Sequence, residues 1–147
     1  MFKKILCPVD FSDTSMNAAY NALNFASEIN AEITFIHALD IQALQNIGDL
    51  SGGSINNLDF LIEEEKPILN KLREECEKKG VKVKTILTHG EPHSVILETI
   101  KEGGYDIVIM GTHGRKGFTR AVLGSMAESV VRESDVPVLL YHCCNKG

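Results

Sequence analysis

Five short apolar runs alternate with longer segments in which apolar residues recur every three or four positions. Short apolar runs are typical of buried strands, and the longer spacing is typical of helices that cover a core. We expect strands at about 5–9, 33–39, 81–87, 106–110 and 136–141, and helices at about 13–29, 58–79, 92–102 and 125–134. Strands joined by helices form parallel sheets through right-handed crossovers. The sequence therefore predicts the α/β class, as a doubly wound, Rossmann-like, five-stranded parallel sheet with helices on both faces.

Three features modify this regular order. Residues 40–57 are polar and contain glycine, so we expect a long, mobile excursion there, acting as a lid over a ligand. Pro67 lies within the second helical segment and should kink or divide that helix. Pro137 cannot donate a ladder hydrogen bond, so the last strand should be an edge strand or begin at this proline. Without an internal repeat or a linker, we expect one domain over residues 1–147.

Charge and composition argue against several classes of binding partner. The net charge of −5 argues against a nucleic-acid binder that relies on an overall basic surface. No apolar run approaches the roughly 20 residues of a membrane span, and the first apolar stretch is too short for a signal peptide. The four cysteines lack the spacing of a zinc site and are too scattered for a disulfide scaffold. We expect a cytoplasmic protein with reduced thiols that binds neither nucleic acid nor membranes.

A loop rich in glycine and basic residues lies between the fourth strand and the last helix. Its glycines permit a close approach of backbone to a ligand, and its basic side chains add positive charge. These residues are Gly111, Gly114, Gly124, Arg115, Lys116 and Arg120. We interpret the loop as a cradle for phosphates. The alternative is a structural turn that needs glycine and carries solvated basic side chains.

The helix that follows this loop supports the phosphate interpretation. Ser125 and Glu128 fit an S-x-x-E capping box, which places the start of the helix at Ser125. A helix start has unpaired N–H groups and the positive end of the helix dipole, and it therefore attracts anions.

The predicted winding of the sheet brings a second sequence feature to the same place. Asp10 ends the first strand and Gly111 ends the fourth. Ligands of open α/β sheets bind at the carboxyl ends of the strands, where the winding direction reverses. If the chain winds outward through strands two and three and returns past strand one, both residues meet in that crevice.

Two motifs resemble the universal stress protein family, and the likeness covers nearly the whole chain. One is the segment 4–12, KILCPVDFS, which is similar to the family's first strand and its terminal aspartate. The other is Gly111-x2-Gly114-x9-Gly124-Ser125, which matches the family's G-x2-G-x9-G-[S/T] pattern at each specified position. The resemblance implies a sheet of order 3-2-1-4-5, ATP binding and a homodimer formed through the last strand.

The resemblance also implies roles for individual residues. Gly114, Gly124 and Ser125 would contact the phosphates, with Gly111 shaping the turn. The backbone near Ala38 would reach the adenine. The full ATP-binding set that we predict is Pro8, Val9, Asp10, Ala38, Met110, Gly111, His113, Gly114, Arg115, Gly124, Ser125 and Met126. The predicted dimer interface consists of Val136, Val138 and Leu140.

The carboxylate of Asp10 would repel neighbouring phosphates unless a cation lay between them. We therefore place Asp10 at the sugar or adenine end, or on Mg²⁺ that bridges it to phosphate oxygens. The alternative is an aspartate that belongs to the turn beside Ser12, which we expect to cap the first helix. Cys7 precedes it in the strand and should act only as a small hydrophobe.

Single residues suggest further interpretations. His113 could contact a phosphate, but a loop histidine is more often exposed. Ser125 and Thr112 are candidate acceptors for autophosphorylation. A Walker loop is absent from the sequence, and a receiver domain would need an aspartate where Thr88-His89-Gly90 follow the third strand.

The sequence as a whole favours a regulatory protein that binds ATP, or ADP or AMP, with Mg²⁺, and that acts as a nucleotide-dependent switch in a stress response. It shows no nucleophile–base pair, so an enzyme is the less favoured reading. The alternatives are a slow Mg-dependent ATPase or autophosphorylating enzyme, and a structural dimer that binds nothing tightly.

Overall fold

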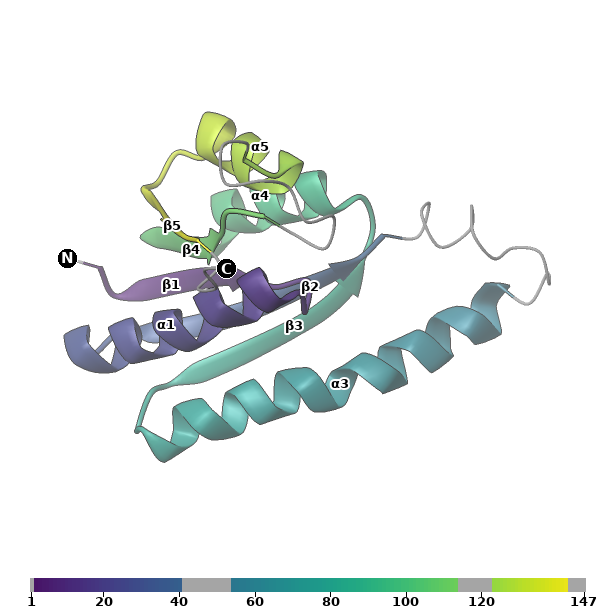
Figure 1. The fold of residues 1–147 in the computed structure, drawn as a ribbon, viewed down its shortest axis with the longest axis horizontal. Coiled ribbons are helices and arrows are strands. Elements are labelled where there is room, and N and C mark those ends of the chain that lie inside the picture. Colours follow the sequence, from purple (N-terminus) through teal and green to yellow (C-terminus); the bar gives the residue numbers. More distant parts are fainter. Residues whose placement is uncertain (1, 41–53, 114–122, 143–147) are drawn as a thin grey trace.

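The computed structural model describes residues 2–40, 54–113 and 123–142, and it places them in alternating strands and helices (Figure 1). The strands are β1 (Lys4–Pro8), β2 (Glu32–Leu39), β3 (Val83–His89), β4 (Ile107–Gly111) and β5 (Val138–Tyr141). The helices are α1 (Asp13–Ile29), α3 (Ser54–Lys78), α4 (Pro92–Gly103) and α5 (Ser125–Glu133). All five predicted strands are present, with their ends shifted by at most two residues.

The sheet is parallel throughout, and its strand order is β3-β2-β1-β4-β5, which confirms the predicted fold class and order. Ile5 of β1 pairs with Ile33 of β2 on one side and with Ile107 of β4 on the other. The chain runs from β1 outward to β3 and then returns to β4, so the winding direction reverses between β1 and β4. The carboxyl ends of these two strands therefore meet at the switch point of the sheet.

Helices cover both faces of the sheet and form two separate apolar cores. In Figure 1, α1 and α3 lie on one side of the sheet, and α4 and α5 lie on the other. The first core joins Leu23 of α1 and Leu72 of α3 to Phe35 of β2. The second joins Ile96 of α4 and Val130 of α5 to the opposite face of the strands. Strands buried on both faces explain why the sequence shows apolar runs in place of alternation.

Two buried cysteines belong to the first core. Cys7 of β1 and Cys76 of α3 are free thiols with no exposed surface. Burial raises the pKa of Cys7, and it raises the pKa of Cys76 to about 11. Both thiols are therefore protonated at neutral pH, which agrees with the expectation that Cys7 acts as a small hydrophobe.

The helix ends follow local chemistry that the sequence displays. Ser12 is the N-cap of α1, and its Oγ accepts a hydrogen bond from the N–H of Ser15 at 3.2 Å. Asn30 ends α1 in the left-handed conformation, with φ of 60°. Pro92 opens α4, where its missing N–H is not needed.

The long helix α3 differs from the prediction at two places. It begins at Ser54, so residues 54–57 are helical and do not belong to the excursion. Residues 41–53, which carry the rest of that excursion, lie outside the described residues. Pro67 is inside α3, and it does not divide the helix. Packing of Leu69 and Leu72 just beyond the proline holds the next turns on the sheet, which offsets the lost hydrogen bond.

The edge strand β5 agrees with the role predicted for its proline. β5 is the last strand in the sheet order and begins directly after Pro137. Pro137 still takes part in the sheet as an acceptor, because its carbonyl oxygen receives the N–H of Val108 at 2.9 Å. Among the described helices, none combines the length and apolarity that a membrane span requires.

The N-cap of α4 gives a pH-dependent prediction. Glu91 accepts hydrogen bonds from the N–H groups of Ser94 and His93, and these bonds, chiefly that of Ser94, lower the pKa of the Glu91 carboxyl. A carboxyl with a lower pKa in the folded state stabilises the protein above its unfolded pKa, and it loses that contribution as the pH falls through the folded value.

We expect Glu91→Ala to lower the free energy of unfolding by about 0.5–1 kcal/mol at pH 7. The difference from the unchanged protein should shrink as the pH falls below about 4. Urea titrations at pH 7 and pH 3 would measure this, and an equal difference at both pH values would contradict the assignment.

Candidate functional site

The turn that follows β1 is fixed by its own backbone and side chains. The N–H of Val9 donates to the carbonyl of Ile36 at 2.9 Å, which extends the pairing of β1 with β2 past Pro8. The N–H of Asp10 donates to Ser15 Oγ at 2.9 Å, and Asp10 Oδ1 accepts the N–H of Ser12 at 3.0 Å. Asp10 is therefore a turn aspartate, as one alternative held, and its half-buried carboxylate lies at the carboxyl edge of the sheet.

Packing against α1, and not the approach of a ligand, explains why Gly111, the last residue of β4, is a glycine. A Cβ at this position would lie 2.8 Å from Cγ2 of Thr14 and 3.0 Å from the carbonyl oxygen of Thr14. Real Cβ atoms do not come that close to other atoms, so the missing side chain lets β4 pass against the first turn of α1. The preceding Met110 is buried in the second core, which leaves only its backbone for the crevice.

The two ends of the glycine-and-basic loop are joined by a backbone hydrogen bond. The N–H of Gly124 donates to the carbonyl of Thr112 at 2.8 Å, and the N–H of Thr112 donates to the carbonyl of Tyr141 at 2.9 Å. Gly114 and Arg115, together with Lys116 and Arg120, lie outside the described residues. The described ends alone place Gly124 directly beside the end of β4.

Two expectations about this loop are wrong. His113 is buried, not exposed, and its Nδ1 lies 3.0 Å from Oγ1 of Thr112. Thr112 is 1 % exposed, so its hydroxyl is not an accessible acceptor for a phosphoryl group. Ser125 is exposed. The position of both buried residues depends on the β4–β5 pairing, and no short-range sequence signal carries it.

The start of α5 differs from the predicted capping box. Gly124 is the N-cap, and Ser125 is the first residue of the helix, so Ser125 cannot cap it. The N-cap Gly124 has no side chain to cap the helix, and Glu128 pairs with Arg132 at 3.0 Å. The first intrahelical bond runs from the N–H of Glu128 to the carbonyl of Gly124. The N–H groups of the first turn, among them those of Ser125 and Met126, therefore have no intrahelical acceptor.

These segments meet at one edge of the sheet. Pro8 ends β1 and leads to Asp10, Gly111 ends β4 and leads to His113, and Gly124 is the N-cap of α5. Ala38 lies one residue before the end of β2, where it pairs with Thr88 of β3. The arrangement is a candidate site at the carboxyl edge of the sheet, with a helix N-terminus, the carboxylate of Asp10 and backbone from two neighbouring strands. Such a set suits an anion that carries a polar group.

One residue near this edge escaped the sequence analysis. His37 of β2 is 5 % exposed, and its ring lies between Val9 and Glu65 of α3. The sequence signal that could have indicated His37 is the presence of a histidine within an apolar strand. Its partners come from other elements, so the sequence could not indicate them.

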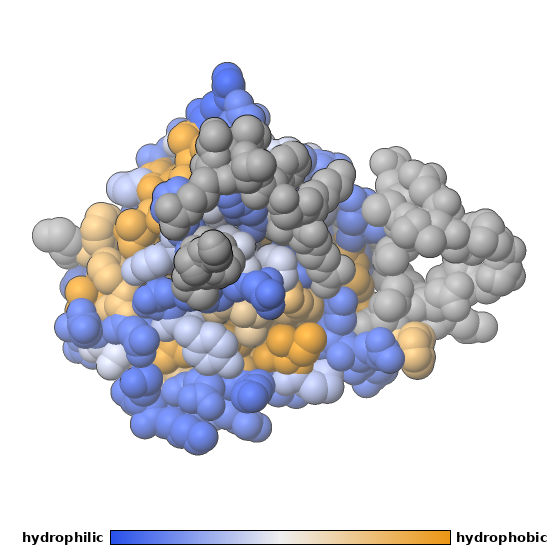
Figure 2. Space-filling model, in the orientation of Figure 1, coloured by the Kyte–Doolittle hydropathy of each residue, from blue (hydrophilic) through white to orange (hydrophobic). Residues whose placement is uncertain are grey.

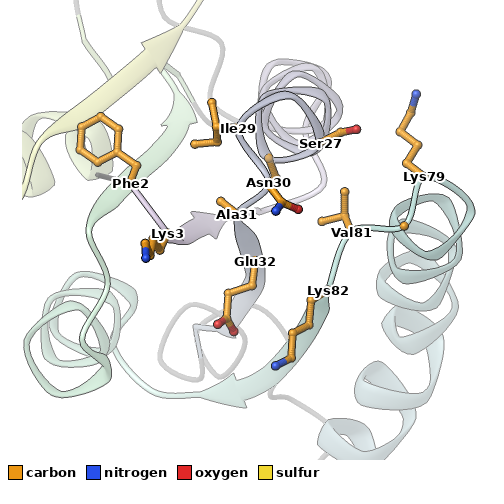
Figure 3. Close-up of a pocket in the computed structure, with 12 residues that line it drawn as sticks. Phe2, Lys3, Ser27, Ile29, Asn30, Ala31, Glu32, Lys79, Val81 and Lys82 are labelled. Carbon is orange, nitrogen blue, oxygen red and sulfur yellow. The ribbon is translucent and has the colours of Figure 1, made fainter.

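The hollow shown in Figure 3 lies elsewhere and contains none of the predicted site residues. Phe2, Ile29 and Val81 line it, and Lys3, Glu32 and Lys82 surround its lower part. These residues stand at the amino ends of the strands and at the end of α1. The hollow is thus at the opposite edge of the sheet from the switch point.

Comparison with known proteins identifies the family. Residues 1–142 match the profile of the universal stress protein family. This chain belongs to that family. Universal stress protein MJ0531 of Methanocaldococcus jannaschii is 36 % identical over 141 residues, which cover 95 % of this chain and 82 % of that protein.

Two solved structures extend the comparison. The structure of MJ0577 from the same organism aligns with a TM-score of 0.84 at 33 % identity and covers 99 % of both chains. A universal stress protein determined in complex with cAMP aligns with a TM-score of 0.69 at 22 % identity, over 97 % of this chain and 98 % of that one. The second likeness concerns the fold alone.

The close contact between Gly111 and Thr14 of α1 in this universal stress protein can be tested by adding a side chain at position 111. We expect Gly111→Ala to lower the free energy of unfolding by about 1–3 kcal/mol, because the added Cβ meets the backbone of Thr14 as well as its methyl group. Urea denaturation would measure the change.

Combining Gly111→Ala with Thr14→Ser should recover only part of the loss, since the backbone oxygen stays in place. A Gly111→Ala variant as stable as the unchanged protein would show that the two segments have room to separate.

Proposed function

We propose that this universal stress protein binds a nucleotide, with ATP as the first candidate and ADP or AMP as alternatives, in the crevice between β1 and β4. The observation that carries the proposal is the start of α5. The N-cap residue Gly124 has no side chain that could cap the first-turn N–H groups, and it holds them beside the end of β4 at the switch point. Unpaired N–H groups at a helix start are a ready site for phosphates.

The roles proposed for individual residues follow from this placement. Ser125 would contact the phosphates through its backbone N–H group. Gly124, whose own N–H donates to Thr112, would let the phosphates approach the backbone, as would Gly114. The backbone near Ala38 would contact the adenine. The family membership and the cAMP complex of a distant member support a nucleotide as the ligand.

Asp10 fits the sugar end or a bridging magnesium ion. Within the described residues, no three His, Cys, Asp or Glu side chains converge as a metal cage would require. A magnesium ion would therefore take most of its ligands from phosphate oxygens and water, as this ion often does, with Asp10 as a single protein carboxylate. The ion would neutralise the repulsion between that carboxylate and the phosphates.

We further propose that nucleotide binding serves a regulatory switch in a stress response and not primarily catalysis. Among the described residues of the crevice, Thr112 and His113 are buried against each other, so neither is presented as a nucleophile or base. A slow Mg-dependent ATPase or autophosphorylation at the exposed Ser125 is the second candidate. The proposal places the protein in the cytoplasm, where Cys7 and Cys76 would remain reduced thiols.

The first test is a calorimetric titration of the nucleotide-stripped protein with Mg·ATP. We expect one site per chain with a dissociation constant in the micromolar range, which corresponds to about −8 kcal/mol. Gly124→Val should abolish binding, because a branched side chain would fill the space where backbone meets phosphate.

Leu123→Val is the matched control, since Leu123 is the exposed neighbour of Gly124, and it should leave the affinity within about twofold. Circular dichroism must show that both variants fold. Normal ATP binding by folded Gly124→Val would exclude the proposed phosphate contact. Absence of binding by the unchanged protein at millimolar ATP would exclude the proposed function.

The edge strand β5 supports a homodimer as a second part of the proposal. β5 is half-buried along its length, and Val136, Val138 and Leu140 pack against the second core. Val131 of the neighbouring α5 is 46 % exposed. In Figure 2 apolar surface gathers on the side of the molecule where β5 and the segment before it lie. An unpaired strand edge beside apolar surface calls for cover, which a second copy would supply.

We expect light scattering to give the mass of a dimer at micromolar concentration, with dissociation on dilution. A monomer throughout the micromolar range would contradict the dimer and leave the nucleotide proposal unaffected.

A further inference from the structure

The ring of His37 is held by three contacts, two from the turn after β1 and one from α3. Its Nδ1 lies 2.8 Å from the carbonyl oxygen of Val9, just beyond β1. Its Nε2 lies 2.7 Å from Oε1 of Glu65 on α3. The ring of Phe11 lies against it, with 4.4 Å between the centroids and 34° between the planes. The two side chains of the ion pair are almost wholly buried, at 7 % exposure for His37 and 16 % for Glu65.

The two ring nitrogens of His37 have different partners. A carbonyl oxygen only accepts, so the Nδ1–H of His37 donates to Val9 and this nitrogen carries a proton. On its other side, Nε2 lies 2.7 Å from Oε1 of Glu65, close enough for an ion pair, although the two atoms are not aligned as a hydrogen bond. His37 and Glu65 therefore form one close, buried pair. The orientation of the ring is therefore set from both sides.

This unit holds both neighbours of Asp10. Val9 is fixed through its carbonyl by His37 and through its N–H by Ile36. Phe11 has φ of 66°, a left-handed conformation that is uncommon for a bulky residue. Packing of its ring on His37 offsets the strain of that conformation. Asp10 lies between these two fixed residues, at the crevice edge.

We propose that His37 is a positioning residue of the nucleotide site, which acts through Asp10 and is itself oriented by Glu65. The inference rests on the proposed function, because it names what sets the carboxylate that faces the sugar or the magnesium ion. It also assigns a role to α3, since Glu65 connects that helix to the turn after β1. His37 does not contact the nucleotide.

The first experiment titrates Mg·ATP into the full chain and its Glu65 variants. Glu65→Ala should weaken ATP affinity about tenfold, because the ring loses the partner that orients it. Glu65→Gln keeps a side chain that can hydrogen-bond Nε2, so it should stay within about twofold of the unchanged protein. Glu63→Ala is the matched control, since it breaks an exposed pair with Lys66 on the same helix, and its affinity should not change.

The second experiment separates positioning from general loss of structure. His37→Phe keeps a ring against Phe11 but removes the hydrogen bond to Val9 and the ion-pair contact with Glu65, and it should weaken ATP affinity about tenfold. In an Asp10→Ala background the same change should cost no further affinity, because His37 acts through that carboxylate. If His37→Phe fails to fold, Glu65→Ala takes its place in this cycle.

The outcomes distinguish this inference from the function on which it rests. An unchanged protein that does not bind ATP overturns the proposed function, and this inference with it. An unchanged protein that binds, with variants that bind equally well, overturns the inference alone. Equal losses in the presence and absence of the Asp10 carboxylate would also overturn it, since they would show a structural effect only. Loss in Glu65→Ala, recovery in Glu65→Gln and no further loss without Asp10 would establish it.

Discussion

The parallel pairing of β1 with β2 on one side and β4 on the other is the interaction on which the rest of the structure depends. It brings the turn after β1 and the end of β4 to the same edge of the sheet, although about 100 residues separate them in the chain. The pairing is tight enough that Gly111 passes against Thr14 with no room for a Cβ. The first turn of α1 and the end of β4 are thereby fixed in contact with each other.

Backbone groups, more than side chains, define the candidate site. The hydrogen bond between Gly124 and Thr112 fixes the start of α5 beside β4, and the bond between Thr112 and Tyr141 anchors β4 to β5. The N-cap glycine supplies no side-chain cap to the helix start. Side chains enter chiefly through the Asp10 turn, whose geometry depends on Ser12, Ser15 and the pair formed by His37 and Glu65.

Most of the fold was predictable, because it depends on local patterns. Apolar runs and helical stripes indicated every strand, and Ser12, Asn30 and Pro92 marked helix ends through chemistry that acts within a few residues. The prediction of a capping box at Ser125 was wrong, because it too relied on a local pattern alone. The motif was present, but the helix begins at Ser125, one residue earlier than a capping serine needs, with Gly124 held beside β4 as the N-cap. The burial of Thr112 and His113 depends on strand pairing that no local pattern encodes.

Local patterns in the sequence indicate the order of strands and helices, the two-sided burial of the sheet and the place of Asp10 and Gly111 at its carboxyl edge. Periodicity and capping residues act over short distances, and parallel strands joined by helices wind by a general rule. The contact of Gly111 with Thr14 and the contacts of His37 with Val9 and Glu65 arise only in the folded chain. Those contacts link residues far apart in the chain, and they exist only after the packed sheet has brought the elements together.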